Sequence, residues 1–267
     1  MLRFQKDQTV FRIGAVDFGG QPGMRRTVMI CPIGLTDEYD LDAQRSMFKE
    51  VTGEYPTAIL VTGSSSEEIA DVLELAKSLN GVPIIIDASS ISDAFSALAE
   101  ENRADLATRV ICGGLNVTTP LSVWENVQEL RIKAAMLDSF HPLDDSLKGR
   151  IYALEDGGDI IDEGLLDRST HYGITMPMIN VGGNGPGGSG LRALLVAKAK
   201  WGLPTGCDLR DVAKKAAIGP EGDLTAATLS QSAGADYVFA SSPKNWARTA
   251  RALSFVDSLM AEACAEM

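Results

Sequence analysis

The residues best placed to do chemistry in this chain are polar side chains that each end a short apolar run. Short, nearly continuous apolar runs suit strands that are buried on both faces, as in a parallel sheet. A polar residue at the end of such a strand has left the core and faces the crevice where α/β folds bind ligands. We therefore expect these side chains to line one pocket. They are Asp87, Asn116, Asp138, Asn180 and Asp208.

For two of these residues, Asp87 and Asn116, both a ligand-binding role and a structural role are consistent with the sequence. The Asp87 carboxylate could accept two hydrogen bonds from the N–H groups of a flat heterocycle, or it could cap the helix that follows. Ser89 or Ser90 could cap that helix instead, which would leave Asp87 free. The Asn116 carboxamide offers a donor and an acceptor, as a pterin or flavin edge requires, but an asparagine turn is the alternative.

Nucleophilic catalysis is disfavoured. Asp138 is followed by Ser139 and His141, but triads are not built from adjacent residues and the chain has no G-x-S-x-G elbow. Asp138 is therefore predicted to be a carboxylate of the pocket wall. Asp208 directly follows Cys207 and would raise the pKa of that thiol, which favours a structural cysteine.

The most distinctive segment is the glycine-rich run 180–190. Gly183, Gly185 and Gly188 match the G-x-G-x-x-G fingerprint of dinucleotide-binding folds, after a predicted strand and before a predicted helix. A proline inside the motif removes one backbone N–H, which weakens the match. An NAD(P)-dependent oxidoreductase is one interpretation. The other is a loop over the pocket whose Asn184 could reach a reacting atom.

Strand-like and helical stretches alternate along the chain. This alternation predicts a single (β/α)8 barrel domain over residues 1–267, with a doubly wound open sheet as the competing fold. Residues 3–23 alternate polar and apolar side chains around a Gly/Pro-rich turn. They predict a short N-terminal β-hairpin, within an extension 1–26, that closes the bottom of the barrel. The eight strand-like runs are 27–33, 57–62, 82–87, 109–115, 132–138, 174–180, 203–207 and 236–240.

Composition excludes several classes of protein. The chain has 267 residues, of which 45% are hydrophobic, and a formal net charge of −12, which argues against a nucleic-acid partner. No apolar stretch approaches the ~20 residues of a membrane span. The charged N-terminus does not resemble a signal peptide, so we expect a cytoplasmic protein. With two histidines and four widely spaced cysteines, no metal site is expected and the thiols are expected to be reduced.

Several segments resemble the family of the tetrahydromethanopterin S-methyltransferase H subunit. Near the N-terminus the similar segments are Leu2-Arg-Phe-Gln-Lys-Asp-Gln, Ile13-Gly-Ala-Val and Gly19-Gly-Gln-Pro-Gly23. Further along they are Trp201-Gly-Leu-Pro-Thr-Gly-Cys207 and Ala233-Gly-Ala-Asp-Tyr-Val-Phe239. The resemblance covers nearly the whole chain. Within this group the chain is most similar to the methylcorrinoid:tetrahydrofolate methyltransferases of glycine betaine demethylation, enzymes of one-carbon metabolism.

The resemblance implies a TIM barrel that binds a pterin at the C-terminal ends of its strands. In such relatives an Asp after the third strand and an Asn after the fourth hold the pterin edge, which carries over to Asp87 and Asn116. The relatives also have an Asp after strand six and an Asn after strand seven. This chain departs from that pattern, because strand six ends in Asn180 and strand seven in Asp208.

The implied reaction moves a methyl group between a methylated corrinoid (cobalamin) carried by a partner protein and nitrogen 5 of tetrahydrofolate, giving methyltetrahydrofolate. Asp138 and Asn180 would complete the walls of the folate site. Asn184 or Asp208 would lie nearest nitrogen 5 and handle its proton. No side chain need become covalent.

The resemblance also implies a homodimer. Within the reaction, a basic patch would have to receive the acidic tail of the folate. The candidates are Arg25, Arg26, Lys148 and Arg150. A non-catalytic subunit that docks a corrinoid protein for another enzyme is a further alternative.

Overall fold

Eight parallel strands close into a barrel in the order β10-β3-β4-β5-β6-β7-β8-β9. The structure, a computed structural model, describes residues 3–35, 38–63, 65–96, 108–182, 187–210, 214 and 220–266. The predicted (β/α)8 barrel is confirmed, and closure of the sheet excludes the open doubly wound alternative. The barrel strands are β3 (Val28–Ile33), β4 (Thr57–Val61), β5 (Ile84–Asp87), β6 (Val110–Leu115), β7 (Ala134–Asp138), β8 (Met176–Asn180), β9 (Thr205–Gly206) and β10 (Tyr237–Phe239).

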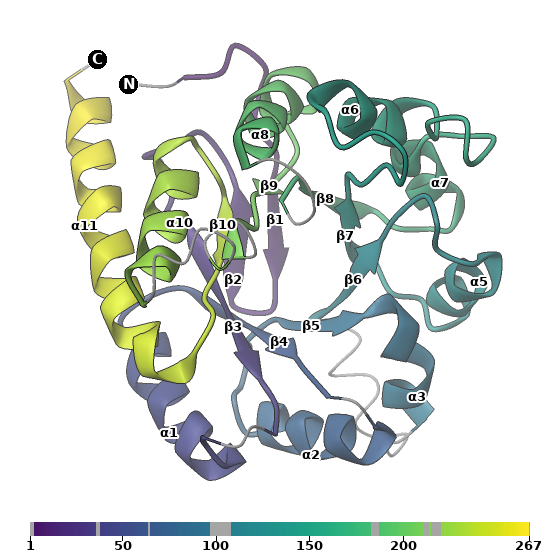
Figure 1. The fold of residues 1–267 in the computed structure, drawn as a ribbon. Coiled ribbons are helices and arrows are strands. Elements are labelled where there is room, and N and C mark those ends of the chain that lie inside the picture. Colours follow the sequence, from purple (N-terminus) through teal and green to yellow (C-terminus); the bar gives the residue numbers. More distant parts are fainter. Residues whose placement is uncertain are drawn as a thin grey trace.

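Helices follow the strands and form the outer ring of the molecule (Figure 1). A 3-10 turn precedes α3, and another precedes the long C-terminal helix. The helices in the described part of the chain are α1 (Leu41–Thr52), α2 (Ser66–Lys77), η1 (Ala88–Ser90), α3 (Ile91–Ser96), α5 (Leu121–Glu129), α6 (Leu147–Glu155), α7 (Leu165–His171), α8 (Gly187–Trp201), α10 (Pro220–Ser232), η2 (Pro243–Asn245) and α11 (Trp246–Ala265).

Helix α2 shows how the sequence builds these outer elements. The Ser65 hydroxyl accepts a hydrogen bond from the backbone N–H of Glu68 at 3.2 Å, which caps the first turn. Ile69, Val72 and Ala76 recur at helical spacing and are buried against the strands. The helix therefore packs with its apolar face on the barrel.

The predicted hairpin is present as β1 (Val10–Ile13) and β2 (Val16–Gly19), paired antiparallel. Ile13 and Phe18 are fully buried in the same cluster as the side chains that fill the barrel interior. The Ala15 N–H donates to the carbonyl of Gly81, in the turn before β5, at 2.6 Å. The hairpin thus closes the end of the barrel where the strands begin.

A buried ion pair fixes α8 to the barrel near this end. Lys198 on α8 is fully buried, and its ammonium group donates to both Asp236 oxygens at 2.6 Å and to the Gly20 carbonyl at 3.3 Å. Asp236 also accepts from the backbone N–H of Thr205 on β9. Buried charges persist when they are paired and hydrogen-bonded in this way.

Candidate functional site

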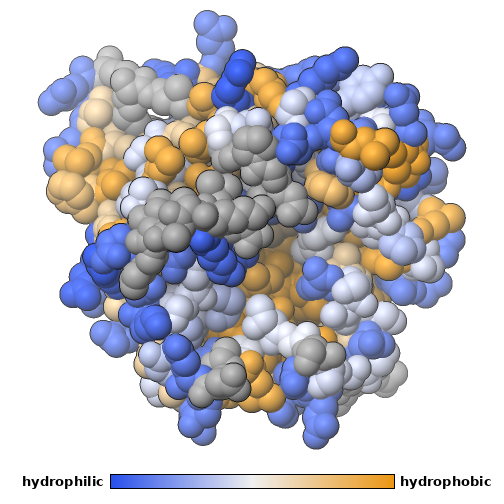
Figure 2. Space-filling model, viewed as in Figure 1, coloured by the Kyte–Doolittle hydropathy of each residue, from blue (hydrophilic) through white to orange (hydrophobic). Residues whose placement is uncertain are grey.

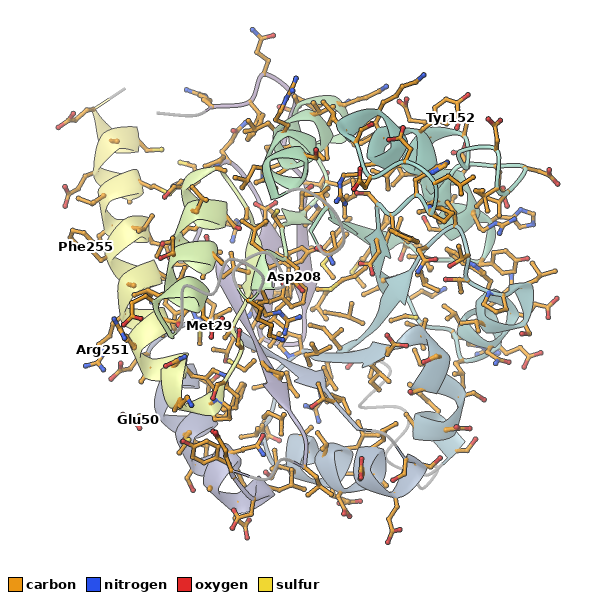
Figure 3. All side chains as sticks on the ribbon, viewed as in Figure 1. Met29, Glu50, Tyr152, Asp208, Arg251 and Phe255 are labelled. Atoms are coloured by element: carbon orange, nitrogen blue, oxygen red, sulfur yellow. The ribbon has the colours of Figure 1, made fainter. Side chains whose placement is uncertain are left out.

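The five polar residues singled out from the sequence lie at the C-terminal ends of five consecutive barrel strands. Asp87, Asp138 and Asn180 are the last residues of β5, β7 and β8, Asn116 directly follows β6, and Asp208 lies two residues beyond β9. Asp138 is paired with Asn180 in the strand register. Figure 3 shows Asp208 near the centre of the ring of helices. The structure therefore brings these residues to one mouth of the barrel.

The mouth is hollowed. Figure 2 looks onto this end and shows a depression near its middle with hydrophobic surface inside it. A cavity of about 310 Å³ lies between the ends of β4 and β5. Its polar lining includes Thr62, Asp87 and Ser90, and its apolar lining includes Leu60 and Ile86. Apolar walls with a few polar groups are the usual composition of a small-molecule site.

Asp138 has the most perturbed environment of the mouth residues. Its Oδ1 accepts a hydrogen bond from Asn180 Nδ2 at 2.9 Å, and Asn180 Oδ1 in turn accepts from the Gly182 N–H at 3.3 Å. Burial raises the pKa of Asp138 to about 7, and the negative charges of Asp208 and Asp87 add to the rise, against the Asn180 hydrogen bond. Asp138 can therefore gain or lose a proton near neutral pH.

Asp87 and Asn116 are held by their own loops. Asp87 Oδ1 accepts from the backbone N–H of Ser89 at 2.9 Å and from its hydroxyl at 2.6 Å, so Asp87 itself caps η1. Ser89 and Ser90 do not replace it as the cap, contrary to one expectation from the sequence. Its other oxygen, Oδ2, accepts no hydrogen bond from the part of the chain that the structure describes.

Asn116 forms the asparagine turn. Its Oδ1 accepts from the Thr118 N–H at 2.8 Å and hydroxyl at 2.7 Å, and its Nδ2 donates to the Gly114 carbonyl at 3.0 Å. Gly114 adopts φ +78°, and a Cβ there would lie 3.0 Å from Asp87 Oδ2. This glycine therefore lets the two residues share one corner of the mouth.

Asp208 is engaged by a residue that sequence reasoning missed. Arg210 donates to both carboxylate oxygens, from Nε to Oδ1 at 2.9 Å and from Nη2 to Oδ2 at 2.7 Å. The guanidinium group also lies over the Phe239 ring, 4.9 Å from its centroid. The spacing Asp-x-Arg after strand seven was the available signal. The Asp208 charge is thus balanced locally.

The loop that follows β8 packs directly against Asp208. A Cβ at Gly182 would lie 1.9 Å from the Asp208 backbone nitrogen, so only glycine fits there. Asn184, with Gly183 and Gly185 of the glycine fingerprint, lies outside the described residues, and Gly188 is in the first turn of α8. The predicted role of Asn184 stays a prediction.

His141 and Cys207, which were considered for nucleophilic catalysis, are not arranged for it in the structure. His141 Nε2 bonds to the Gly158 carbonyl at 2.8 Å, and its Nδ1 accepts from the Leu143 N–H, so it does not pair with Asp138. Cys207 is buried, and burial raises its pKa to about 12. Neither arrangement provides an activated nucleophile.

Two of the four candidates for binding an acidic tail are at the wrong end of the barrel. Arg25 and Arg26 precede β3, and they contact Asp17 and the Glu54 carbonyl on the hairpin side. Arg150 is buried at the mouth, where Nη1 donates to the Ser139 and Gly182 carbonyls, each at 3.4 Å.

Of the four candidates, Lys148 on α6 is exposed at the mouth end. No cluster of three metal-binding side chains occurs among the described residues. None of the helices described is both long enough and apolar enough to cross a membrane.

Comparison with known protein families gives a match over nearly the whole chain. The model of the family described as tetrahydromethanopterin S-methyltransferase MtrH subunit matches residues 6–267. The H subunit of tetrahydromethanopterin S-methyltransferase from Methanothermobacter marburgensis is 26% identical and aligns over 100% of this chain and 96% of its own. The H subunit of the putative methyltransferase mtx from Methanosarcina barkeri is 30% identical over 79% of this chain and 74% of its own.

Solved structures with the same fold include dihydropteroate synthases. That of Xanthomonas albilineans superposes with a TM-score of 0.64 at 15% identity, over 96% of this chain and 98% of its own. That of Coxiella burnetii, solved with pteroic acid, superposes with a TM-score of 0.62 at 13% identity, over 94% and 100%. At these identities the likeness shows the TIM-barrel fold.

Proposed function

The chain belongs to the MtrH family of methyltransferase subunits, and on that premise we propose that it transfers a methyl group between a methylated corrinoid protein and nitrogen 5 of tetrahydrofolate. The observation that carries this proposal is the row of polar side chains at the barrel mouth, with one carboxyl group whose pKa is raised to about 7. A flat, N–H-rich pterin ring needs such acceptors at its edge, and methyl transfer to nitrogen requires one proton to be moved.

Asp87 and Asn116 would hold the pyrimidine edge of the pterin. The Oδ2 atom of Asp87 faces Gly114, which lacks a side chain, so a ring can approach the carboxylate there. Both residues are already fixed by hydrogen bonds to their own loops, which reduces the entropy lost when the ring binds. Asn180 and Asp138 would form the opposite wall.

The methylated corrinoid supplies an electrophilic methyl group; nitrogen 5 takes this group as the carbon–cobalt bond breaks and both bonding electrons stay with cobalt, which leaves as cobalt(I). The chain contributes orientation, exclusion of water and the handling of the proton that nitrogen 5 releases. We assign that proton to Asp138, because its pKa is raised to about 7 and close to the working pH.

We propose a different role for Asp208 from that of proton acceptor, which was expected of Asn184 or Asp208. Both of its oxygens already accept hydrogen bonds from Arg210, so it would serve as a fixed, charge-balanced wall beside the reacting nitrogen. Asn184 remains the candidate to contact nitrogen 5 from the glycine-rich loop. Lys148, which is exposed at the mouth end, is the remaining candidate to receive the acidic tail of the substrate.

The test is to mix the purified protein with methylcobalamin and tetrahydrofolate and to follow the cobalamin spectrum. We expect loss of the methyl–cobalt band as methyltetrahydrofolate appears. A parallel reaction with tetrahydromethanopterin decides which pterin is preferred, since relatives carry that substrate in their names. No transfer to either pterin would contradict the proposal and favour the non-catalytic subunit, and binding of NAD(P) without pterin binding would favour the oxidoreductase.

Two substitutions locate the pterin within the mouth. Asp87→Ala and Asn116→Ala should each weaken pterin binding by about tenfold or more, the size of a lost hydrogen bond to a charged or well-oriented group. Fluorescence titration gives the dissociation constants. If both variants bind the pterin as the wild type does, the pocket is misassigned.

We also propose that the active form is a homodimer, as the family resemblance implies. Sedimentation equilibrium of the purified chain measures its mass in solution directly. A monomer at the concentrations of the assay would contradict this part of the proposal.

A further inference from the structure

A groove of about 880 Å³ lies at the end of the barrel opposite to the mouth. It is larger than the 310 Å³ cavity at the mouth and falls within the size range of small-molecule sites. Its walls are the hairpin β1–β2 with the segment that follows it, the turn 52–57 before β4 and the turn 78–82 before β5. The proposed methyl transfer does not use this groove.

The groove carries an excess of positive charge in a protein whose net charge is −12. Three arginines line it, Arg12, Arg25 and Arg26, together with two acidic residues, Asp17 and Glu54. Asp17 is shared, because it forms ion pairs with both Arg12, at 3.0 Å, and Arg25. A single carboxylate therefore balances two guanidinium groups.

Arg26 is held in place by neutral groups. Its Nη1 donates to the Glu54 carbonyl at 3.0 Å and its Nη2 to the Ser254 hydroxyl at 3.4 Å, and the guanidinium lies 5.5 Å from the centroid of the Tyr55 ring. No carboxylate among the described residues forms an ion pair with it. The Asp257 carboxylate behind it is bonded by the Tyr55 hydroxyl at 2.6 Å. The Asp257 carboxylate interacts with the Arg26 charge without an ion pair, so this charge is only partly balanced within the protein.

The walls of the groove are fixed to one another. The hairpin tip meets the turn before β5 through the Ala15 N–H, which donates to the Gly81 carbonyl, and a Cβ at Gly14 would lie only 2.2 Å from that carbonyl oxygen. Gly14 and Gly81 both adopt positive φ, which this close crossing requires. A site built on walls fixed in this way loses little entropy on binding.

We propose that this groove binds a phosphorylated small molecule through Arg12, Arg25 and Arg26. The forked guanidinium group matches phosphate oxygens in a bidentate geometry, and a phosphate brings about two negative charges to arginines that share one carboxylate. The ligand would compete with Asp17 for Arg12 and Arg25 and would find Arg26 ready to bind.

The test is calorimetric titration of the intact protein with pyrophosphate and, separately, with ATP at low ionic strength. We expect a dissociation constant of about 1 mM or tighter for at least one of them. Equal affinity for the two ligands identifies the phosphate groups as the whole of the recognition, and tighter binding of ATP adds contacts from the organic part; both outcomes support the proposal. Affinity weaker than about 10 mM for both ligands overturns it.

Three variants separate a built site from general attraction to positive charge. Arg25→Gln with Arg26→Gln should weaken binding by about tenfold or more, because charge-assisted hydrogen bonds are lost. Asp17→Asn should strengthen binding by roughly threefold, since it removes the competing carboxylate. The control, Lys244→Gln with Arg192→Gln, removes the same charge from exposed sites on η2 and α8 and should leave the affinity unchanged.

The direction of the Asp17→Asn effect distinguishes a ligand site from a merely structural ion network, which would not gain affinity when its carboxylate is removed, and the charge-matched control excludes general attraction. Thermal melting of each variant checks that it is folded. Equal losses in the arginine variant and the control would show nonspecific attraction and overturn the proposal, as would weaker binding in a folded Asp17→Asn protein.

Discussion

Replacing Asp138 with asparagine should make the protein more stable and less active at the same time. Asparagine keeps the shape of the side chain and an oxygen that can accept the hydrogen bond from Asn180 Nδ2, which measures 2.9 Å in the wild type. The substitution removes the titration of the carboxyl group and little else. A gain in stability together with a loss of rate is what we expect when the replaced group destabilises the fold but is needed for the reaction.

The size of the stability gain follows from the pKa of Asp138, which burial raises from 3.8 to about 7. Between these values the unfolded chain has released the proton while the folded chain retains it, so stability falls as the pH rises through this window and levels off above about pH 7. The rise corresponds to at most about 4 kcal/mol. Asp138→Asn should therefore gain almost nothing at pH 4, about 2 kcal/mol at pH 5.5 and up to about 4 kcal/mol at pH 8.

The activity should change in the opposite sense. In the direction that forms methyltetrahydrofolate the carboxylate accepts a proton, so the wild-type rate should rise with pH through about 7. In the reverse direction the neutral acid donates, and the rate should fall over the same range. Asp138→Asn should lower both rates by about 10²-fold to 10⁴-fold and flatten both profiles.

Urea unfolding from pH 4 to pH 8 and the spectroscopic transfer assay over the same range measure the two effects. Asp162→Asn is the matched control, because Asp162 is exposed between α6 and α7 and should change neither. A variant that keeps the wild-type pH profile would refute the assignment of the proton to Asp138. A variant with no pH-dependent gain in stability would refute the raised pKa on which the assignment rests.

Two further substitutions test the packing around the two ends of the barrel. Lys198→Met should cost about 3–5 kcal/mol of unfolding free energy, because Asp236 stays buried without its partner, whereas Lys200→Met, at an exposed ion pair, should cost less than about 1 kcal/mol; equal losses in guanidinium unfolding would contradict this. Gly114→Ala should cost about 1–2 kcal/mol, because φ is +78° there. It should also weaken pterin binding, because the new Cβ would lie 3.0 Å from Asp87 Oδ2, and unchanged affinity would separate Asp87 from the pterin.

The barrel was predictable because its strands are nearly continuous apolar runs. The predicted strands differ from the observed ones only in where they begin and end. The seventh run was expected over 203–207 but pairs as a strand only over Thr205–Gly206. Pro204 lacks the N–H that a ladder needs, although its carbonyl still accepts from Ile179. After the last strand, Pro243 opens a 3-10 turn, and α11 begins at Trp246.

The position of the mouth residues was also predictable, because a polar residue after an apolar strand must emerge at the strand's C-terminal end. The same rule explains the error over Arg25 and Arg26, which precede a strand and so lie at the opposite end. The partners of the mouth residues were not predictable in this way. The bond between Asn180 and Asp138 joins residues 42 positions apart, and it depends on the register of β7 and β8.

The contacts give a physical meaning to Asn180 after strand six and Asp208 after strand seven, which depart from the pattern that the sequence resemblance implies. An aspartate after strand six could not donate the hydrogen bond that Asn180 donates to Asp138, and two adjacent carboxylates would repel each other. In this chain the aspartate follows strand seven, as Asp208, and its charge is balanced by Arg210, which binds both of its oxygens. The mouth therefore keeps its carboxyl groups, but the one buried beside a neutral amide, Asp138, is left to exchange its proton near pH 7. Under the proposed function, exchanging the acid and the amide between the two strands would assign substrate binding and proton transfer to different residues.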